Sequence, residues 1–449
     1  MDKLLQQTAV RAAAYLHSLD DRSVAPTAAA IAGLAAFDEP LPAGPSDPAA
    51  VIELLDRVGS PATVVNAGGR YFGFVNGGAL PAALAANWLA GAWDQNASLH
   101  VMSPVAARLE EITLVWLVEL LGLPGGCGGA FVSGATMANL AGLAAARRTL
   151  LLRQGWDVEL QGLFGAPELR RVVGDEVHVS VLKALSLLGL GRERVTRVPT
   201  DGQGRMRAEA LPPLDDRTIV CLQAGNVNSG AFDPAEPICA AARAAGAWIH
   251  VDGAFGMWAA AAPARAHLAV GLAEADSWAT DAHKWMNVPY DCGVVICRQP
   301  EALRGAMAVL APYLQLGDQR EPQHYGPEFS RRARGVEVWA ALPSLGRSGV
   351  ADLVERCCRH ATRFAEGLRA AGHNVLNEVT LNQVLVSFGD AETTRRVIGA
   401  VQADGTCWCG GTTWQGHAAM RISVSSWATN AEDVERSLAA IVQVARAEM

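Results

Sequence analysis

The sequence predicts an α/β fold with a mainly parallel sheet and a smaller α+β domain at its C-terminal end. Short β-rich runs alternate with helical patterns between residues 129 and 297, the order that produces a parallel sheet covered on both faces. A long helical stretch at 331–371 is followed by mixed strands and helices, which indicates a second domain. Half of the 449 residues are apolar and only 18% are charged, so a large core can form.

The expected elements divide into three parts. Residues 1–70 form an N-terminal helical segment, with helices at 2–19 and 48–58. The large domain covers 71–335, and its β-rich runs are 129–132, 171–174, 176–179, 194–198, 218–222, 248–251, 277–280 and 293–297. Its helices are expected at 81–93, 103–121, 139–153, 181–188 and 234–245. The small C-terminal domain covers 336–449, with strands at 381–388 and 421–424 and helices at 393–403 and 431–448.

Composition disfavours several classes of protein. A net charge of −8 without basic clusters is a poor match to nucleic acid or to an anionic membrane. Two long uncharged stretches, 74–93 and 120–146, are interrupted by Gly, Pro, Asn and Ser, and we expect buried elements of a soluble protein there. The nine cysteines lack the spacing of disulfides or of a zinc site, so we expect free thiols, a cytoplasmic location and no metal.

Lysine is scarce: the chain has three, Lys3, Lys183 and Lys284, against 34 arginines. A lysine in an apolar setting then suggests amine chemistry, because arginine cannot form a Schiff base. Lys284 lies between His283 and Trp285, just after an expected strand. The alternative is a side chain that merely extends past Trp285 to the surface.

Two other segments could carry chemistry. At 131–140 a short strand leads through Gly134, Ala135 and Thr136 into an Ala-rich helix, whose first N–H groups and positive dipole end suit a phosphate. Such tight turns also occur without a ligand. Asp252 follows the apolar strand at 248–251, where open α/β sheets bind ligands, although it could simply cap the next turn.

Together the three features predict a pyridoxal 5'-phosphate site. The helix start would bind the phosphate, Asp252 would keep the pyridine nitrogen protonated, and Lys284 would form a Schiff base with the aldehyde. The combination is much more specific than any one of its parts.

With these motifs the chain resembles the pyridoxal-phosphate-dependent group II amino-acid decarboxylases, which include aromatic-L-amino-acid, glutamate, histidine and diaminobutyrate decarboxylases. The resemblance runs from about residue 71 to the C-terminus. The motifs that carry it are 103–104, 133–136, 178–180, 230–233, 250–254, 283–285 and 330–334. It implies the fold-type I architecture of aspartate aminotransferase, with a mainly parallel seven-stranded sheet. It also implies a homodimer with the active site at the subunit interface.

The resemblance assigns cofactor-binding roles. It implies that Lys284 is the Schiff-base lysine, that Asp252 pairs with the pyridine nitrogen, and that Ala254 packs against the ring. His178 would stack on the opposite ring face, and His283 would lie beside the phosphate turn. That turn would consist of Gly134, Ala135 and Thr136.

The implied reaction is decarboxylation of an L-amino acid to carbon dioxide and the amine. Tyr313 matches the loop tyrosine that protonates the substrate carbon, so the catalytic residues would be Lys284, His178, Tyr313 and Asp252. The related aldehyde synthases carry Phe in place of this tyrosine, so Tyr313 favours simple decarboxylation.

The chain departs from the family pattern at two places. Gly225-Asn226-Val227 stands where the family has Gly-Thr-Thr, which removes a hydroxyl near the cofactor. Asn96 and Ser98 stand where the animal aromatic decarboxylases line a pocket with apolar side chains. The sequence therefore leaves the amino-acid substrate open.

Three other kinds of activity are alternatives. Another pyridoxal-phosphate lyase or a decarboxylation-dependent aldehyde synthase would use the same fold, and product analysis separates them. A catalytically silent cofactor-binding protein is disfavoured by the intact Lys284, Asp252, His178 and Tyr313. A Rossmann dehydrogenase is disfavoured because no strand leads into Gly-x-Gly-x-x-Gly with an acid about 20 residues later.

Overall fold

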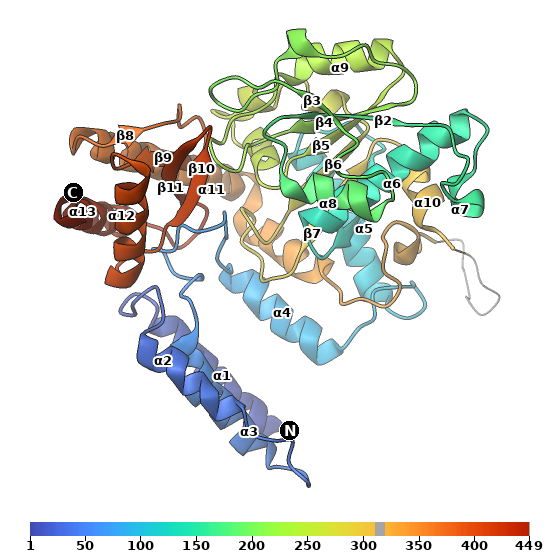
Figure 1. Cartoon of the computed structure of the whole chain (residues 1–449). Coiled ribbons are helices and arrows are strands. Elements are labelled where there is room, and N and C mark those ends of the chain that lie inside the picture. The colour runs from blue at the N-terminus through green and yellow to red at the C-terminus, as the bar shows by residue number, and fades with distance from the viewer. Residues whose placement is uncertain (310–318, 449) are drawn as a thin grey trace. The chain divides into compact units, whose positions relative to one another are not determined.

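The computed structural model describes residues 1–309 and 319–448 (Figure 1). By its internal contacts the chain divides into two compact units: one comprises 77–362 and 377–384, and the other comprises 1–76, 363–376 and 385–449. The domain boundaries after residues 70 and 335 stay a prediction.

A seven-stranded sheet organises the larger unit (Figure 1). Its strand order is β1-β7-β6-β5-β4-β2-β3. The strands are β1 Gly128–Val132, β2 Arg170–Gly174, β3 Thr196–Val198, β4 Thr218–Gln223, β5 Trp248–Asp252, β6 Ser277–Asp281 and β7 Gly293–Cys297. Strands β3, β2, β4, β5 and β6 are parallel neighbours, while β7 is antiparallel to both β6 and β1. The predicted α/β class with a mainly parallel seven-stranded sheet is confirmed.

One expected strand is wrong. Residues 175–176 form a turn, 177–178 have no regular structure, and helix α8 (Val179–Leu187) begins directly after them. The side chain of His178 accepts a hydrogen bond from the Ser180 N–H at 3.3 Å and thereby caps this helix. The local preference of Val177 and Val179 for strand is outweighed because capping satisfies a helix N–H that would otherwise lack a partner.

The helices of this unit pack on the sheet and on one another. Helix α6 (Ala135–Arg153) packs against β5, β6 and β7, and α8 and α10 pack against α6. Most of the α6 side chains that face inward are alanine or leucine, and the small ones let helix and sheet approach closely. The remaining helices of this unit are α4 Pro81–Trp93, α5 Pro104–Leu120, α7 Val158–Gln161, α9 Ala235–Ala244 and α10 Pro300–Met307.

The smaller unit contains most of a four-stranded sheet in the order β10-β11-β9-β8; the first two residues of β9 belong to the larger unit. Its strands are β8 Asn374–Val375, β9 Gln383–Ser387, β10 Gly410–Trp414 and β11 His417–Ser423, and its helices include α12 Ala391–Asp404 and α13 Ala431–Glu448. The long helix α11 (Gly335–Ala370) contributes residues to both units and is interrupted at Gly346, where φ is 63°. A smaller α+β domain in this part of the chain is therefore confirmed.

The N-terminal helices are α1 Asp2–His17, α2 Ala28–Gly33 and α3 Pro48–Leu54. None of the three has a buried residue. The chain after them is anchored within its own unit by Arg70, whose Nη2 donates to the Asp20 carbonyl at 2.7 Å. Short 3-10 turns lie at Leu34–Phe37, Ser60–Ala62, Ala208–Ala210, Gly256–Ala261, Ala266–Ala269, Leu272–Glu274 and Pro322–His324, and a π-helical turn lies at Leu55–Gly59.

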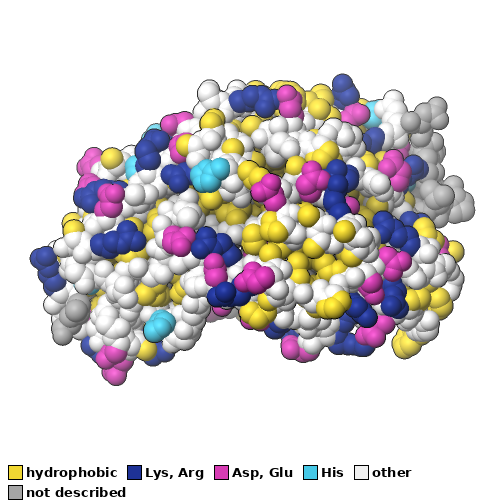
Figure 2. All heavy atoms as spheres, turned by 90° about the horizontal axis from the view of Figure 1, so that it is seen from above, with side chains coloured by type: hydrophobic (Ala, Val, Ile, Leu, Met, Phe, Trp, Pro, Cys, Tyr) yellow, Lys and Arg dark blue, Asp and Glu magenta, His cyan; other side chains and the backbone are white. Residues whose placement is uncertain are grey.

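Throughout the described ranges, no helix has both the length and the apolar character needed to cross a membrane. All nine cysteines are free thiols. On the face shown in Figure 2, acidic, basic and apolar side chains are interspersed.

Candidate active site

Three chain segments converge at one edge of the seven-stranded sheet. Strands β5 and β6 are parallel, so Asp252, the last residue of β5, and Lys284, three residues beyond the end of β6, leave the sheet on the same side. Strand β1 is related to β6 through two antiparallel pairings and therefore runs in the same direction. Consequently helix α6, which follows β1, begins at the same edge.

A cavity of about 400 Å³ lies at this edge. Its lining residues are Ser133, Gly134, Ala135, Thr136, Met137, His178, Ser180, Ala254, Asp281, His283, Lys284 and Tyr290. The structure thus brings together the predicted phosphate turn, His178, Ala254, His283 and Lys284. Asp252 lines a smaller cavity, to which His178 also contributes. Tyr313 lies outside the described residues.

The phosphate turn presents backbone donors to the larger cavity. Gly134 is the N-cap of α6 and supplies no side-chain cap. The Ala135 N–H donates to Asp281 Oδ1 at 2.6 Å, whereas no hydrogen bond from the Thr136 N–H is found within 1–309 and 319–448. A methyl group on Gly134 would lie 3.3 Å from the His283 ring, so the turn is tightly packed. An anion at this helix start would gain the second N–H and the Thr136 hydroxyl.

Lys284 is held by an acid that the sequence analysis did not single out. Its Nζ lies 3.2 Å from Asp281 Oδ2, and the two side chains are 17% and 3% exposed. A Cβ at Gly77 would lie 1.9 Å from the Lys284 carbonyl oxygen, so only glycine allows this close approach of the two segments.

His283 forms the third side of this cluster. Its Nδ1 accepts the Cys292 N–H at 3.1 Å, and its Nε2 lies 3.6 Å from Asp281 Oδ1. Burial lowers the pKa of His283, with Asp281 acting in the opposite direction. The neutral ring therefore carries its proton on Nε2, facing Asp281, and packs against the Tyr290 ring at a centroid distance of 4.3 Å.

Asp252 is 5% exposed and accepts hydrogen bonds from three elements. Its Oδ2 lies 3.2 Å from both Asn139 Nδ2 and Ser180 Oγ, and its Oδ1 accepts the Ala254 N–H at 3.2 Å. Ser180 Oγ also lies 2.8 Å from His178 Nδ1. Ser180 thus links the acid to His178, the residue expected to stack on the cofactor.

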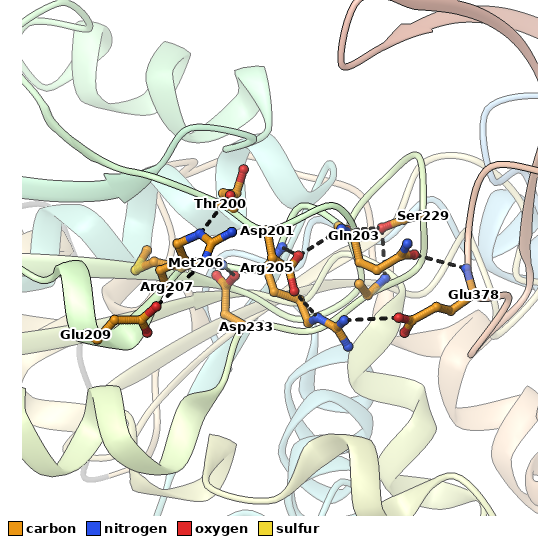
Figure 3. A network of polar contacts seen from close by, with 11 residues as sticks. Thr200, Asp201, Gln203, Arg205, Met206, Arg207, Glu209, Ser229, Asp233 and Glu378 are labelled. Atoms are coloured by element: carbon orange, nitrogen blue, oxygen red, sulfur yellow. Dashed lines mark hydrogen bonds and ion pairs between the residues drawn. The ribbon is translucent and has the colours of Figure 1, made fainter.

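The smaller cavity is bounded in part by the loop at 201–207, which side-chain contacts hold in place. Asp233 accepts the N–H groups of Met206 and Gln223, both at 2.7 Å, and burial raises its pKa to about 6. Figure 3 shows how Arg205 of the same loop pairs with Asp201 at 2.7 Å and with Glu378 at 3.3 Å. Asp233 and Gly204 line the smaller cavity together with Asp252.

The residues that depart from the family pattern make hydrogen bonds within the chain. Asn226 donates to Gln223 Oε1 at 3.0 Å and accepts the Asn228 and Ser229 N–H groups, so it closes the turn after β4. Asn96 donates to Ser330 Oγ at 3.1 Å, and Ser98 donates to Gln323 Oε1 at 2.6 Å. None of the three lines the cavity of about 400 Å³.

Sequence reasoning missed Asp281, Ser180, Asn139 and Tyr290. Asp281 gave one available signal, since it is a charged residue at the end of an apolar strand, three positions before Lys284. Ser180 follows His178 by two residues, but its contact with Asp252 depends on tertiary packing. Asn139 sits on an Ala-rich helix, where an amide carries no local signature.

The residues present fit pyridoxal phosphate. The helix start offers the phosphate the Thr136 N–H, which makes no hydrogen bond among residues 1–309 and 319–448. The buried Asp252 carboxylate, which accepts from neutral donors, suits a protonated pyridine nitrogen. Lys284 supplies an amine at the cavity wall. Fold and site thus define a fold-type I enzyme that uses pyridoxal phosphate.

The comparisons with known proteins agree with the use of pyridoxal phosphate. The family described as "Pyridoxal-dependent decarboxylase conserved domain" matches residues 60–389. An aromatic-L-amino-acid decarboxylase of Bacillus atrophaeus is 28% identical over 74% of this chain and 69% of its own length. An L-2,4-diaminobutyrate decarboxylase of Rhizobium meliloti (strain 1021) is 28% identical over 81% of this chain and 75% of its own length.

Solved structures show the same fold. The crystal structure of Oryza sativa TDC with PLP and tryptamine superposes with a TM-score of 0.91 at 22% identity, covering 100% of this chain and 98% of that one. The chain belongs to the pyridoxal-dependent decarboxylase family, and with it to the carboxy-lyases that use pyridoxal phosphate.

Proposed function

We propose that this chain decarboxylates an L-amino acid, releasing carbon dioxide and the amine, with Lys284 as the residue that binds the aldehyde of the cofactor. The observation that supports this most is the convergence of Lys284, Asp252 and the start of α6 at one sheet edge. When bound, pyridoxal phosphate supplies an electron sink for the carbon that loses its carboxylate.

The chain's own residues would have distinct tasks. Asp252 would accept the pyridine N–H, and the hydrogen bonds that it accepts from Asn139, Ser180 and Ala254 would hold the carboxylate in place for that contact. His178, held by Ser180 at 2.8 Å, would cover one ring face and exclude water. The N–H and hydroxyl of Thr136 would bind the phosphate.

We expect Tyr313 to decide whether the product is an amine or an aldehyde. The resemblance implies that its hydroxyl protonates the substrate carbon after carbon dioxide leaves, and an aldehyde synthase on the same fold is the alternative. The Rhodiola rosea protein named 4-hydroxyphenylacetaldehyde synthase is 28% identical over 60% of this chain. The test measures amine, aldehyde and ammonia per carbon dioxide released. One amine per carbon dioxide supports decarboxylation to the amine, whereas aldehyde and ammonia in equal amounts, in place of the amine, would show an aldehyde synthase.

The substrate class has to be determined by experiment, because the relatives are named for different amino-acid substrates. An acidic amino acid decarboxylase of Mus musculus is 29% identical over 64% of this chain and 54% of its own length, close to the identities of the aromatic and diaminobutyrate enzymes. Carbon dioxide release should be measured with the twenty amino acids plus diaminobutyrate, ornithine and DOPA. Release from none of them, with the cofactor bound, would overturn the proposed activity.

A homodimer is the proposed assembly. The N-terminal helices leave large apolar side chains uncovered, with Leu5, Val10 and Val51 at 57%, 70% and 51% exposed. Such a face is normally covered by another protein surface. Light scattering of the full chain should give twice the chain mass, and Val10→Asp should shift the measured mass toward the monomer.

The nine free thiols support a reducing, cytoplasmic location.

A further inference from the structure

A buried chain of hydrogen bonds leads to Asp252. Trp248 Nε1 donates to Ser277 Oγ at 3.0 Å, and Ser277 Oγ lies 2.8 Å from His250 Nδ1. His250 Nε2 lies 2.9 Å from Asn139 Oδ1, and Asn139 Nδ2 donates to Asp252 Oδ2 at 3.2 Å. Every member is at most 5% exposed.

The chemistry of the two end residues fixes the direction of every hydrogen bond in this series. The indole N–H of Trp248 can only donate, and the ionised carboxylate of Asp252 can only accept. Asn139 must therefore turn its NH₂ toward Asp252 and its oxygen toward His250. The oxygen can only accept, so His250 carries its proton on Nε2, and its Nδ1 accepts from the Ser277 hydroxyl.

The arrangement keeps positive charge away from Asp252. Burial lowers the pKa of His250 to about 4, so the imidazole is neutral at physiological pH. A cationic histidine at this place would compete with a protonated pyridine nitrogen for the carboxylate. Neutral donors instead stabilise the anion and leave its charge available to the cofactor.

An independent observation shows that the His250 ring is clamped. Gly142 of α6 packs against it: a Cβ at that position would lie 2.8 Å from His250 Cε1 and 2.9 Å from Nδ1. Glycine in the middle of a helix is unfavourable compared with alanine, and at this position the missing Cβ has a local reason. The close approach of α6 to the imidazole provides it.

We propose that His250 and Asn139 are positioning residues that hold the Asp252 carboxylate oriented toward the cofactor ring, and that Gly142 fixes the His250 imidazole in this chain of hydrogen bonds. The inference rests on the proposed role of Asp252 as the partner of the pyridine nitrogen. His250 and Asn139 are not expected to touch substrate or cofactor.

A double-mutant cycle on the full chain tests the coupling. His250→Leu should lower kcat about tenfold with KM nearly unchanged, and should raise the dissociation constant for pyridoxal phosphate by a similar factor. In the Asp252→Asn background the same change should alter both quantities by less than about twofold, because the residue through which it acts is already disabled. His250→Gln, which keeps an N–H donor, should recover most of the loss.

The outcomes separate the two proposals. If the fold-changes caused by His250→Leu and by Asp252→Asn multiply in the double variant, the positioning role of His250 is overturned. Asp252 can then still be the partner of the pyridine ring. Wild-type turnover and cofactor affinity in Asp252→Asn alone would instead overturn the proposed role of Asp252.

A second variant tests the same inference without removing a hydrogen-bonding group. Gly142→Ala should displace the imidazole and weaken pyridoxal phosphate binding about tenfold. The matched control is Gly399→Ala in α12, where a new Cβ would meet nothing within 4 Å and binding should not change. Equal affinity in the two alanine variants would contradict the clamp.

Discussion

The carboxylate of Asp281 joins the amine and the phosphate turn of the site. Its Oδ2 lies 3.2 Å from Lys284 Nζ, and its Oδ1 accepts the Ala135 N–H at 2.6 Å. One buried acid at the end of β6 therefore positions Lys284 and the start of α6 relative to each other. Because the side chain of Asp281 is 3% exposed, both contacts are shielded from solvent.

Substitution of Asp281 should separate its two contacts. Asp281→Asn keeps an oxygen for the Ala135 N–H, whereas Asp281→Ala leaves that buried donor without a partner. We expect the alanine variant to be less stable than the asparagine variant by about 1–3 kcal/mol. Thermal unfolding of the cofactor-free proteins measures this difference. Equal midpoints would show that the hydrogen bond to Ala135 contributes nothing to stability.

Lys284 should carry the cofactor. Purified protein should absorb visible light because of bound pyridoxal phosphate, and borohydride reduction should leave a pyridoxyl group on Lys284. Lys284→Ala should lose the covalent link. Peptide mapping is the measurement, with Lys183, an exposed residue of α8, as the internal control. A pyridoxyl group found on Lys183 would refute the assignment.

Asp252→Asn should still bind the cofactor at saturating pyridoxal phosphate but lose nearly all turnover. An amide cannot hold the pyridine proton, and loss of one charge-assisted hydrogen bond in a dry site costs about 3 kcal/mol, or about a hundredfold in rate. Asp276→Asn is the matched control, because Asp276 is bound to the Ile249 N–H at 2.8 Å at the opposite end of β5. The measurements are cofactor content and carbon dioxide release, and a near-wild-type rate would count against Asp252.

Asp233 should make stability depend on pH. Burial raises its pKa from 3.8 to about 6, so between about pH 4 and 6 the folded chain binds more protons than the unfolded chain. The contribution of this group to the free energy of unfolding is therefore lost as the pH rises through that window, by up to about 3 kcal/mol.

The test compares wild type with Asp233→Asn, which cannot titrate. The melting temperature of wild type minus that of the variant should be largest near pH 4 and should fall toward pH 7. The variant also removes one acceptor for the Met206 and Gln223 N–H groups, so a constant offset is expected at all pH values. A difference that does not change with pH would refute the raised pKa.

Much of the fold was predictable because local patterns agree with it. Helices at 81–93 and 431–448 match α4 and α13 at both ends, where Pro81 and an acidic first turn mark the starts. Short elements were missed, among them β8, β10 and α10. Strand β8 has only two residues and β10 includes two glycines, so neither carries a strong β pattern.

The sequence by itself determined the strand–helix alternation and the use of pyridoxal phosphate. Lys284, Asp252 and the turn of Gly134, Ala135 and Thr136 could be singled out because each follows a strand and has a side chain or backbone suited to one part of pyridoxal phosphate. Only the tertiary structure decided which residues support them. Ala135 and Asp281 are 146 positions apart, and Asn139 and Asp252 are 113 apart. Such contacts depend on the register of β5 against β6 and on where α6 starts, which no local pattern encodes.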